Sequence, residues 1–333
     1  MQALTFDKTG NPEDVLKICE TDKPVPKNGE VLIKVLMSPI NPADILFITG
    51  KYRFQPVFPQ TAGMEGCGIV EAVSNDVTGI QRGSLVAFFS MNVWAEYVVA
   101  NSSQVFVLPA DFNREKAAQF CLNPFTAYGL LQAAHVKEND WLLITAGSSA
   151  VAKIVTQLAK GRQARVILAI RNMQYAGALK KLGADEVIDI TKDDWDGQIL
   201  SVTQQKGVNA ALDTLGGEAG TRLLNIMAAN ATIVLYAAIN KDNVSFHNAQ
   251  FVYKQLTLKG FGIRHFLDGQ TAAEKNKMIT SLTAAMANSA FECRLQQHLR
   301  LPASDRHWHQ TGKIPARAKP CLYSINNKSI SFS

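Results

Sequence analysis

The sequence predicts an α/β protein with two domains, one mostly β-stranded and one built on a doubly wound parallel sheet. Its 333 residues exceed what one ordinary core holds, so two domains are expected. Up to about residue 120, apolar runs of strand length are separated by clusters of Pro, Gly, Asn and Ser, which is typical of strands joined by turns. From about residue 121 to 258, strands alternate with helices. This alternation requires a parallel sheet with crossover helices.

The strands and helices are expected at defined places. In the first segment, the predicted strands are 1–6, 31–36, 68–73, 85–89 and 94–99. In the second, the predicted strands are 141–145, 165–170, 186–189, 210–213 and 233–236, and the predicted helices are 151–160, 176–182 and 219–227. After Gly260 we expect one amphipathic helix at 273–288, and then short strands that return to the first domain. The predicted domains are therefore 1–122 with 261–333, and 123–260.

The segment 141–172 has the pattern of a nucleotide-binding strand, turn and helix followed by a second strand. The small residues 146–150 follow the first strand, and apolar residues then recur at helical spacing. A helix start offers free backbone N–H groups and the positive end of the helix dipole, which can hold a pyrophosphate. The expected donors to this group are Ser148, Ser149, Ala150 and Val151. A crossover that binds nothing remains the alternative, because Gly147 is the only glycine of the turn and Ala152 replaces the last fingerprint glycine.

The second strand of this segment ends in a cation, which indicates the kind of dinucleotide. Residues 165–170 run into Arg171 and Asn172, where a site that prefers NAD usually carries Asp or Glu for the ribose 2′-hydroxyl. A guanidinium suits a 2′-phosphate instead. The sequence thus predicts NADPH as the cofactor, with Arg171 on the 2′-phosphate and Asn172 and Tyr175 beside it. A solvated surface arginine is the competing interpretation.

Composition and charge exclude several classes of protein. The net charge of +6 is modest and the Lys and Arg residues are dispersed, which argues against a nucleic-acid surface and is compatible with an anionic cofactor or thioester. No apolar run approaches the roughly 20 residues that span a bilayer, so no membrane partner is expected. The chain enters a strand-like segment at once, without a leader pattern, which predicts a cytoplasmic location.

The five cysteines are scattered along the chain, at positions 19, 67, 121, 293 and 321. An odd number of distant cysteines favours reduced thiols over a disulfide framework. No pair of them has metal-ligand spacing. Most are expected to be small core residues.

Several short motifs, taken in order, carry a family resemblance. They are Asn-Pro-Ala-Asp at 41–44 with Gly-Lys-Tyr at 50–52, Gly-Met-Glu-Gly-Cys-Gly at 63–68, Asn-Pro-Phe-Thr-Ala-Tyr at 123–128, Leu-Gly-Ala-Asp at 182–185, Asp-Thr-Leu-Gly-Gly at 213–217 and Lys-Gly-Phe at 259–261. Through them the chain, to about residue 300, resembles the medium-chain dehydrogenase/reductase superfamily, in its zinc-free branch of quinone oxidoreductases and 2-enoyl thioester reductases. The resemblance implies a GroES-like, mostly β catalytic domain packed on a Rossmann nucleotide-binding domain, with the active site in the cleft between them. It also implies a homodimer, commonly formed through the nucleotide domain.

Two positions separate this chain from the zinc enzymes that it resembles. Zinc dehydrogenases of the superfamily carry a Cys in place of Ser38 and a His in place of Met64, just before Glu65. Catalytic zinc needs three protein ligands, and neither Ser38 nor Met64 supplies a thiolate or an imidazole. No metal site is therefore expected. Without a Lewis acid, the natural chemistry is reduction of an acceptor that is already electron-poor.

The resemblance also assigns roles to single residues. Tyr52 matches the tyrosine to which the enoyl thioester reductases of the family assign proton donation. A phenol stays protonated at neutral pH, so it can hydrogen-bond a developing enolate and deliver a proton. An aromatic lid that only packs on the substrate is the alternative. Asp44 is expected to orient its loop without a catalytic part.

Four further residues are expected at the cofactor through the same resemblance. Asn41 and Thr126 look like the family's nicotinamide and ribose contacts, with turn chemistry and helix capping as their respective alternatives. Tyr236 follows a strand where the family has a turn over the nicotinamide. Phe261 precedes Gly262 where enoyl thioester reductases have an aromatic pair, so the acyl pocket is expected to be wider or looser.

These features together predict an NADPH-dependent, zinc-independent oxidoreductase with a small-molecule substrate. The hydride acceptor is a quinone, or the C=C bond of an α,β-unsaturated carbonyl or enoyl thioester, and the sequence leaves this choice open. A non-catalytic NADPH-binding protein, crystallin-like or regulatory, is the alternative. At the end of the chain, the prolines within 315–320 interrupt the usual closing strand, so the terminus beyond Gly312 is expected to be altered or poorly ordered.

Overall fold

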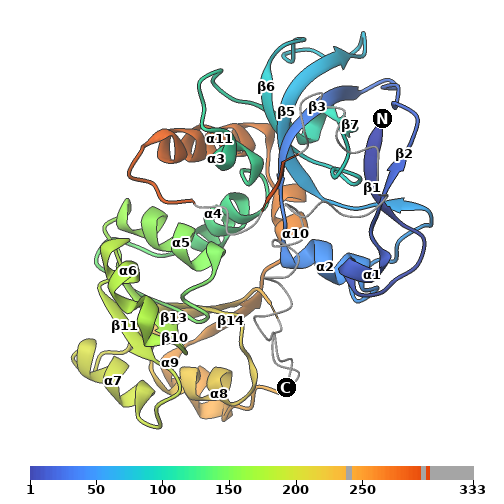
Figure 1. Cartoon of the computed structure of the whole chain (residues 1–333). Coiled ribbons are helices and arrows are strands. Elements are labelled where there is room, and N and C mark those ends of the chain that lie inside the picture. The colour runs from blue at the N-terminus through green and yellow to red at the C-terminus, as the bar shows by residue number, and fades with distance from the viewer. Residues whose placement is uncertain (238–241, 294–297, 301–333) are drawn as a thin grey trace. The chain divides into compact units, whose positions relative to one another are not determined.

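A computed structural model describes residues 1–237, 242–293 and 298–300 of the chain (Figure 1). It has two compact units. The first holds Met1–Leu122 and the strand His298–Arg300, and the second holds Asn123–Cys293. The second unit runs past the boundary predicted at residue 260, because helices between 263 and 287 pack against the first helix of this unit. The predictions made for Cys321 and for the segment after Gly312 lie outside the described residues.

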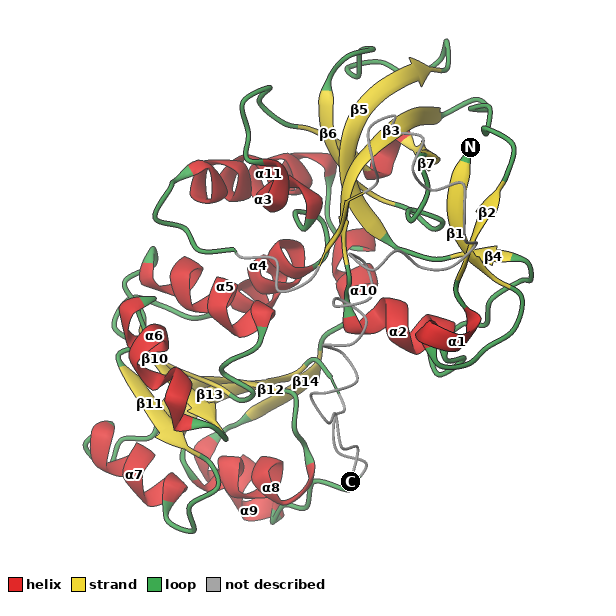
Figure 2. Ribbon diagram, viewed as in Figure 1, coloured by secondary structure: helices red, strands yellow, loops and turns green. Residues whose placement is uncertain are grey.

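The first unit is mostly β-stranded, as predicted (Figure 2). Its elements are β1 (Gln2–Phe6), α1 (Pro12–Val15), β2 (Lys17–Glu20), β3 (Glu30–Pro39), α2 (Pro42–Ile48), β4 (Gln60–Thr61), β5 (Glu65–Val73), β6 (Leu85–Phe89), β7 (Tyr97–Asn101), β8 (Val105–Val107), α3 (Arg114–Ala118) and β15 (His298–Arg300). One sheet has the order β2-β1-β4; the other has the order β15-β3-β5-β6-β8, with β7 also paired to β3. The pairings are antiparallel, and one apolar core lies between Val31, Ile33, Val70, Val86 and Phe88.

The second unit alternates strands and helices. Its elements are α4 (Asn123–Ala133), β9 (Trp141–Ile144), α5 (Ala150–Lys160), β10 (Arg165–Ile170), α6 (Ala176–Lys181), β11 (Glu186–Asp189), α7 (Trp195–Val202), β12 (Val208–Asp213), α8 (Gly217–Asn225), β13 (Met227–Leu235), α9 (Asn248–Lys254), β14 (Thr257–Gly260), α10 (Ile263–Asp268) and α11 (Ala272–Ala287). The strands form one parallel sheet, in the order β11-β10-β9-β12-β13-β14. The chain therefore steps outward from β9 on one side and from β12 on the other.

This strand order creates a switch point between β9 and β12. In open α/β sheets, ligands bind at the carboxyl ends of the strands beside such a point. Several strand ends predicted for this edge agree closely with the structure. The predictions 165–170 and 186–189 match β10 and β11, because both are continuous apolar runs bounded by polar residues. The parallel, doubly wound sheet predicted from the alternation is confirmed.

Other boundaries predicted from the sequence are wrong. The helix predicted at 219–227 is α8, which ends at Asn225, and β13 begins at Met227 instead of at residue 233. The polar residue Asn230, at φ 61°, interrupts the apolar pattern near this start, and the pairing of β13 with β12 is irregular there. The strand predicted at 94–99 begins at Tyr97, because the backbone of Trp94 is hydrogen-bonded to Leu4 and Ala62 and not to β3.

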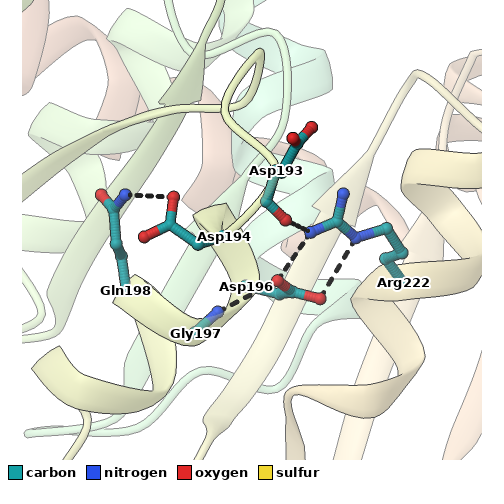
Figure 3. A network of polar contacts seen from close by, with 6 residues as sticks. All are labelled: Asp193, Asp194, Asp196, Gly197, Gln198 and Arg222. Carbon is teal, nitrogen blue, oxygen red and sulfur yellow. Dashed lines mark hydrogen bonds and ion pairs between the residues drawn. The ribbon is translucent and has the colours of Figure 1, made fainter.

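One side-chain contact joins the two helices α7 and α8 on the outside of the sheet (Figure 3). Arg222 donates from Nε to Asp196 Oδ2 at 3.1 Å and from Nη2 to Asp196 Oδ1 at 2.7 Å. The same guanidinium donates to the backbone carbonyl of Asp193 and lies 5.0 Å from the ring centre of Trp195. The two-pronged geometry of arginine suits a carboxylate. The contact therefore fixes the start of α7 against α8.

Candidate active site and cofactor site

A buried polar network surrounds Glu65 at the start of β5. Asn41 donates from Nδ2 to Glu65 Oε1 at 2.9 Å, and the backbone N–H of Leu122 donates to Glu65 Oε2 at 2.9 Å. Asn41 also begins α2, where its backbone N–H donates to Asp44 Oδ2 at 2.7 Å. Asn41, Asp44 and Glu65 are all buried. The turn interaction given as the alternative for Asn41 is therefore present, and its side chain also donates to Glu65.

Ser38, which stands where zinc relatives carry a cysteine, belongs to the same buried region. Its hydroxyl donates to the backbone carbonyl of Glu65 at 2.7 Å and accepts from Trp94 Nε1 at 3.1 Å. Both side chains are at most 1% exposed. The serine therefore joins β3 to β5 and satisfies the indole N–H, which a buried tryptophan requires.

Burial changes the acidity of the two carboxyl groups in this network. Burial raises the pKa of Glu65 to about 8, and the charge of Asp44 adds to the rise, whereas hydrogen bonds from Asn41 and Leu122 oppose it. Burial also raises the pKa of Asp44 to about 7, against the hydrogen bond from the Asn41 backbone. Loss of water around a carboxylate disfavours its charged form. The pair therefore titrates near neutral pH.

Tyr52 lies in the loop after α2. Its side chain is half-buried, packs on the cluster that contains Phe47, and meets Phe54 edge-on at a ring-centre distance of 4.9 Å. Arg53 lies 5.8 Å from the centre of the tyrosine ring. The ring is held by these apolar neighbours, and no hydrogen bond of its hydroxyl is made with the described residues. The geometry suits both a proton donor and a lid.

In the second unit, the turn between β9 and α5 is shaped for a close approach. Ala146 has φ 48°, and a Cβ on Gly147 would lie 2.7 Å from Leu168 Cβ, so only glycine fits. Ser149 begins α5, and its hydroxyl accepts from the N–H of Ala152 at 3.2 Å. The first N–H groups of a helix have no partner within it. Those of Ala150 and Val151 are therefore available for an anion at the turn.

Two polar side chains from other strand ends lie near this turn. Asp213 ends β12, where it accepts from Thr145 Oγ1 at 2.7 Å and from the N–H of Gly216 at 2.9 Å. The buried hydroxyl of Tyr236, after β13, makes no hydrogen bond of ordinary geometry with a described residue, although Ser149 lies near enough to affect it. Burial raises the pKa of Tyr236, and the charge of Asp213 adds to this effect. The sequence pointed to Tyr236 but not to the Thr145–Asp213 pair, which joins strands 68 residues apart.

The carboxyl end of β10 presents the residues predicted for the 2′-phosphate. Arg171 and Asn172 are exposed, and Asn172 Oδ1 accepts from the N–H of Gln174 at 3.0 Å. Tyr175 is also exposed, at 37%. Arg171 forms no ion pair with any residue in the described ranges. Its guanidinium is thus open to solvent and to an anion.

Thr126 and Phe261 lie in the same unit and have structural contacts of their own. Thr126 is the fourth residue of α4, inside the helix, so the N-cap role weighed for it is wrong. The N–H of Phe261 donates to the carbonyl of Leu235 at 2.7 Å, and its ring packs 5.7 Å from Phe266. A Cβ on Gly129 would lie 2.6 Å from the Phe261 ring. Phe261 therefore packs β14 against α4.

The predicted site residues thus fall into two groups. Asn41 and Tyr52 belong to the first unit. The second unit holds Thr126, Ser148, Ser149, Ala150, Val151, Arg171, Asn172, Tyr175, Tyr236 and Phe261. In the second unit, the turn after β9, Arg171 after β10 and Tyr236 after β13 all follow the carboxyl ends of strands. This is the edge at which a doubly wound sheet binds ligands.

The described residues offer neither a metal site nor a helix that could span a membrane. No three His, Cys, Asp or Glu side chains of residues 1–237, 242–293 and 298–300 gather as metal ligands. None of the helices described for the chain has the length and apolar character needed to cross a bilayer. Cys67 and Cys121 are buried and Cys19 and Cys293 are half-buried, and none of the four forms a disulfide within the described ranges.

Models of known protein families match segments in both units of the chain. The family model for the alcohol dehydrogenase GroES-like domain matches residues 27–110, and that for zinc-binding dehydrogenases matches residues 150–280. A model for the TrkA-N domain also matches residues 99–190. The GroES-like prediction for the first domain is therefore confirmed.

Similar individual proteins indicate which branch of the dehydrogenase/reductase superfamily the chain matches. The chain is 30% identical to the mitochondrial enoyl-[acyl-carrier-protein] reductase of Dictyostelium discoideum over 87% of this chain and 85% of that protein. It is 29% identical to the bovine protein of the same name, over 85% of this chain and 78% of that one. The structure of a mycobacterial quinone oxidoreductase is 30% identical, with a TM-score of 0.80, over 88% of this chain and 90% of that one. The chain thus belongs to the zinc-free quinone and enoyl reductase branch of the medium-chain dehydrogenase/reductase superfamily.

Proposed function

We propose that this protein is an NADPH-dependent reductase of 2-enoyl thioesters. The observation that carries the proposal is the edge of the parallel sheet in the second unit. There the Gly147 turn, the exposed guanidinium of Arg171 and the buried hydroxyl of Tyr236 follow three strand ends beside the switch point. Such an edge suits a dinucleotide with a 2′-phosphate.

The residues at this edge fit the cofactor. The helix start at Ser149 offers backbone N–H groups to a pyrophosphate, and Gly147 lets it approach. Arg171 offers two-pronged hydrogen bonds to a phosphate. A structure of a mycobacterial protein in complex with NADPH, 30% identical and with a TM-score of 0.77, supports the same cofactor. When bound, NADPH supplies the hydride that reduces the β-carbon of the alkene.

The chain's own residues have three tasks in this reaction. The first is to hold the thioester so that its β-carbon faces the hydride donor, and positioning of this kind contributes effective molarities of about 10⁵ to 10⁸ M. The second is to donate a hydrogen bond to the enolate oxygen that forms. The third is to deliver one proton to the α-carbon. In this proposal the Tyr52 hydroxyl performs the second and third tasks, and its phenolate regains a proton from water.

The substrate class is supported by the curated relatives. Those with up to 30% identity over most of this chain are named enoyl-[acyl-carrier-protein] reductases. Quinone reduction is the second candidate, because the mycobacterial neighbour at 30% identity is named a quinone oxidoreductase. A quinone needs no proton donor placed at a carbon atom. The part played by Tyr52 therefore separates the two candidates.

A homodimer belongs to the same proposal. β14 is the edge strand of the parallel sheet, so one side of it is unpaired within the described chain. On α9, which packs against the neighbouring strand β13, Val252 is 67% and Tyr253 is 84% exposed. Unpaired edges and exposed apolar side chains favour association. Sedimentation of the full chain and of Tyr253→Glu tests this: the first should run as a dimer, and the second should shift toward monomer.

The compartment remains a prediction. The sequence favours the cytoplasm, whereas relatives at up to 30% identity are named mitochondrial. Fractionation of cells that express the full chain, with a tag after the last residue, decides between the two.

The activity is tested by following NADPH absorbance with three acceptors. We expect oxidation with a crotonyl thioester, and slower or no oxidation with a quinone and an alkenal. Turnover with the quinone alone would favour the second candidate. Tight NADPH binding without turnover of any acceptor would favour a non-catalytic binding protein.

A further inference from the structure

The second unit has an open pocket of about 790 Å³, called the cavity below, that the proposed reaction does not use. It is lined by α4, α5 and α11 and by the turn between α6 and β11. α4 lies between α5 and α11 (Figure 2), and their side chains form the walls. Pockets of about 300 to 1,000 Å³ are the size that holds small ligands.

This cavity is far from the predicted cofactor edge. The cofactor turn precedes α5 at Ser149, whereas the cavity meets the other end of that helix at Gln157, Leu158 and Arg162. The 11 residues of α5 separate the two ends by about 16 Å at 1.5 Å per residue. Leu182 and Gly183 on its wall precede β11, so they also lie at the amino-terminal side of the sheet. The cavity is thus a separate place in the same unit.

The charge of the cavity wall is positive. Lys160, Arg162 and Lys277 line it, and no Asp or Glu does so among the described residues. Lys160 is paired with Asp185 at 3.1 Å outside the wall, whereas Arg162 and Lys277 form no ion pair with any described residue. The cavity therefore offers two uncompensated cations to an anionic ligand.

Arg162 is the more unusual of these two cations. Its side chain is half-buried, and its guanidinium lies 5.9 Å from the ring centre of Tyr128. Burial lowers the pKa of Arg162, and Tyr128 opposes this effect. A half-buried guanidinium without a carboxylate costs free energy that a bound anion would offset.

The rest of the wall presents more apolar than polar surface, although Gln132, Gln157, Ser281 and Asn288 also line it. Leu158, Leu182, Ala285 and Phe291 line it together with the ring of Tyr128. Phe291 is only 8% exposed. Apolar walls with a few placed polar groups are typical of ligand sites, in which the polar groups orient the ligand.

We propose that this cavity binds an organic carboxylate with an alkyl body, the carboxylate on Arg162 and Lys277 and the alkyl chain along Leu158, Leu182 and Phe291. The proposal goes beyond the reductase reaction and does not depend on it. The two-pronged geometry of the guanidinium matches a carboxylate. The apolar walls select a carboxylate with an attached chain over a small inorganic anion.

Calorimetry on the full chain with saturating NADPH tests this proposal, with decanoate, decanol and inorganic phosphate as probes. We expect decanoate to bind, with decanol and phosphate each at least about tenfold weaker. The variant Arg162→Gln should weaken decanoate binding by about tenfold or more, as expected for loss of a charge-assisted hydrogen bond. Arg165→Gln is the matched control, because Arg165 is exposed in the same unit and does not line the cavity. It should bind decanoate as the parent does.

Several outcomes would overturn the proposal. If decanol bound as tightly as decanoate, the carboxylate would not contribute to recognition. If phosphate bound as tightly as decanoate, the alkyl chain would not contribute. If NADPH displaced decanoate, decanoate would bind at the cofactor edge and not in the cavity. If Arg162→Gln failed to fold, the exposed Lys277→Gln decides: a loss of affinity supports the proposal, and unchanged affinity contradicts it. A titration without NADPH gives the same answer if the chain does not bind that cofactor.

Discussion

Asn41 donates a hydrogen bond from its side chain to Glu65 Oε1 at 2.9 Å, across 24 residues of sequence. The bond ties the start of α2 to the start of β5, and it does so in a buried place where both groups need partners. Tyr52 follows α2 in the chain. The position of Tyr52, the proposed proton donor, therefore depends on the hydrogen bonds around Glu65, although Tyr52 makes none of them.

Removal of the Asn41 amide is expected to destabilise the first unit. Asn41→Ala leaves Glu65 Oε1 without its donor in a buried site, which costs about 1 to 3 kcal/mol. Urea denaturation measures the change. Asn101→Ala is the control: Asn101 is exposed and accepts from the N–H of Ser103 at 3.0 Å at the start of a short helix. Equal losses in the two variants would show that the buried bond has no special weight.

The raised pKa of Glu65 predicts how stability changes with pH. The folded-state pKa is about 8, against 4.5 for the free group, so between these values the folded chain holds a proton that the unfolded chain has released. The stability from this group is fully present below pH 4.5 and is lost as pH rises through about 8. Asp44, with a pKa of about 7, acts in the same direction. The urea midpoint should therefore fall from pH 6 to pH 8.

Glu65→Gln provides the comparison for this effect. The amide cannot ionise, so the fall in the urea midpoint over this pH range should become shallower. The variant also places an N–H₂ group against one of the two donors, Asn41 or Leu122, and should lose stability at every pH. A slope equal to that of the parent would mean that Glu65 does not titrate in this range.

Arg171 is expected to decide the preference for NADPH over NADH. Arg171→Gln removes the cation proposed for the 2′-phosphate, and loss of such a charged hydrogen bond corresponds to about 10- to 100-fold weaker NADPH binding. NADH binding should change little. Fluorescence titration with both coenzymes measures the two constants. Arg165→Gln, at the opposite end of the same strand, should alter neither.

The contact between Arg222 and Asp196 is expected to stabilise the second unit. Arg222→Lys keeps the charge but loses the two-pronged geometry, and we expect a loss of about 1 kcal/mol. Lys17→Ala breaks the exposed pair with Asp7 and should change stability by less than Arg222→Lys does, because solvent screens an exposed pair. Thermal denaturation compares them. A smaller loss for Arg222→Lys than for Lys17→Ala would contradict this account of Figure 3.

How much of the structure the sequence predicts follows from the range of the interactions. β6, β10 and β11 are found where the apolar runs place them, because burial of a whole strand leaves a local pattern. α4 was not predicted as a helix, since Asn123 and Pro124 at its start resemble a turn and its apolar residues lie around more than one face. Helix α4 is surrounded by partners distant in sequence.

The site divides in the same way. Local signals placed the turn at Gly147, the start of the helix that follows it and the cation at Arg171. The contacts of Asn41 with Glu65 and of Thr145 with Asp213 join segments 24 and 68 residues apart, and no local pattern announces them. No local pattern marks Arg162 either, because it has no carboxylate partner among the described residues only as a result of how α4, α5 and α11 pack together.

The variant Tyr52→Phe, assayed with a crotonyl thioester and with a quinone at saturating NADPH, tests most directly whether Tyr52 is the proton donor. The substitution removes one oxygen atom and keeps the ring that packs on Phe54. We predict that kcat for the thioester falls by about 10²- to 10⁴-fold with little change in KM, since loss of a general acid acts on the chemical step. Any quinone turnover should stay as in the parent. A variant that reduces the thioester at the parent's rate would contradict the assignment of Tyr52 as the proton donor.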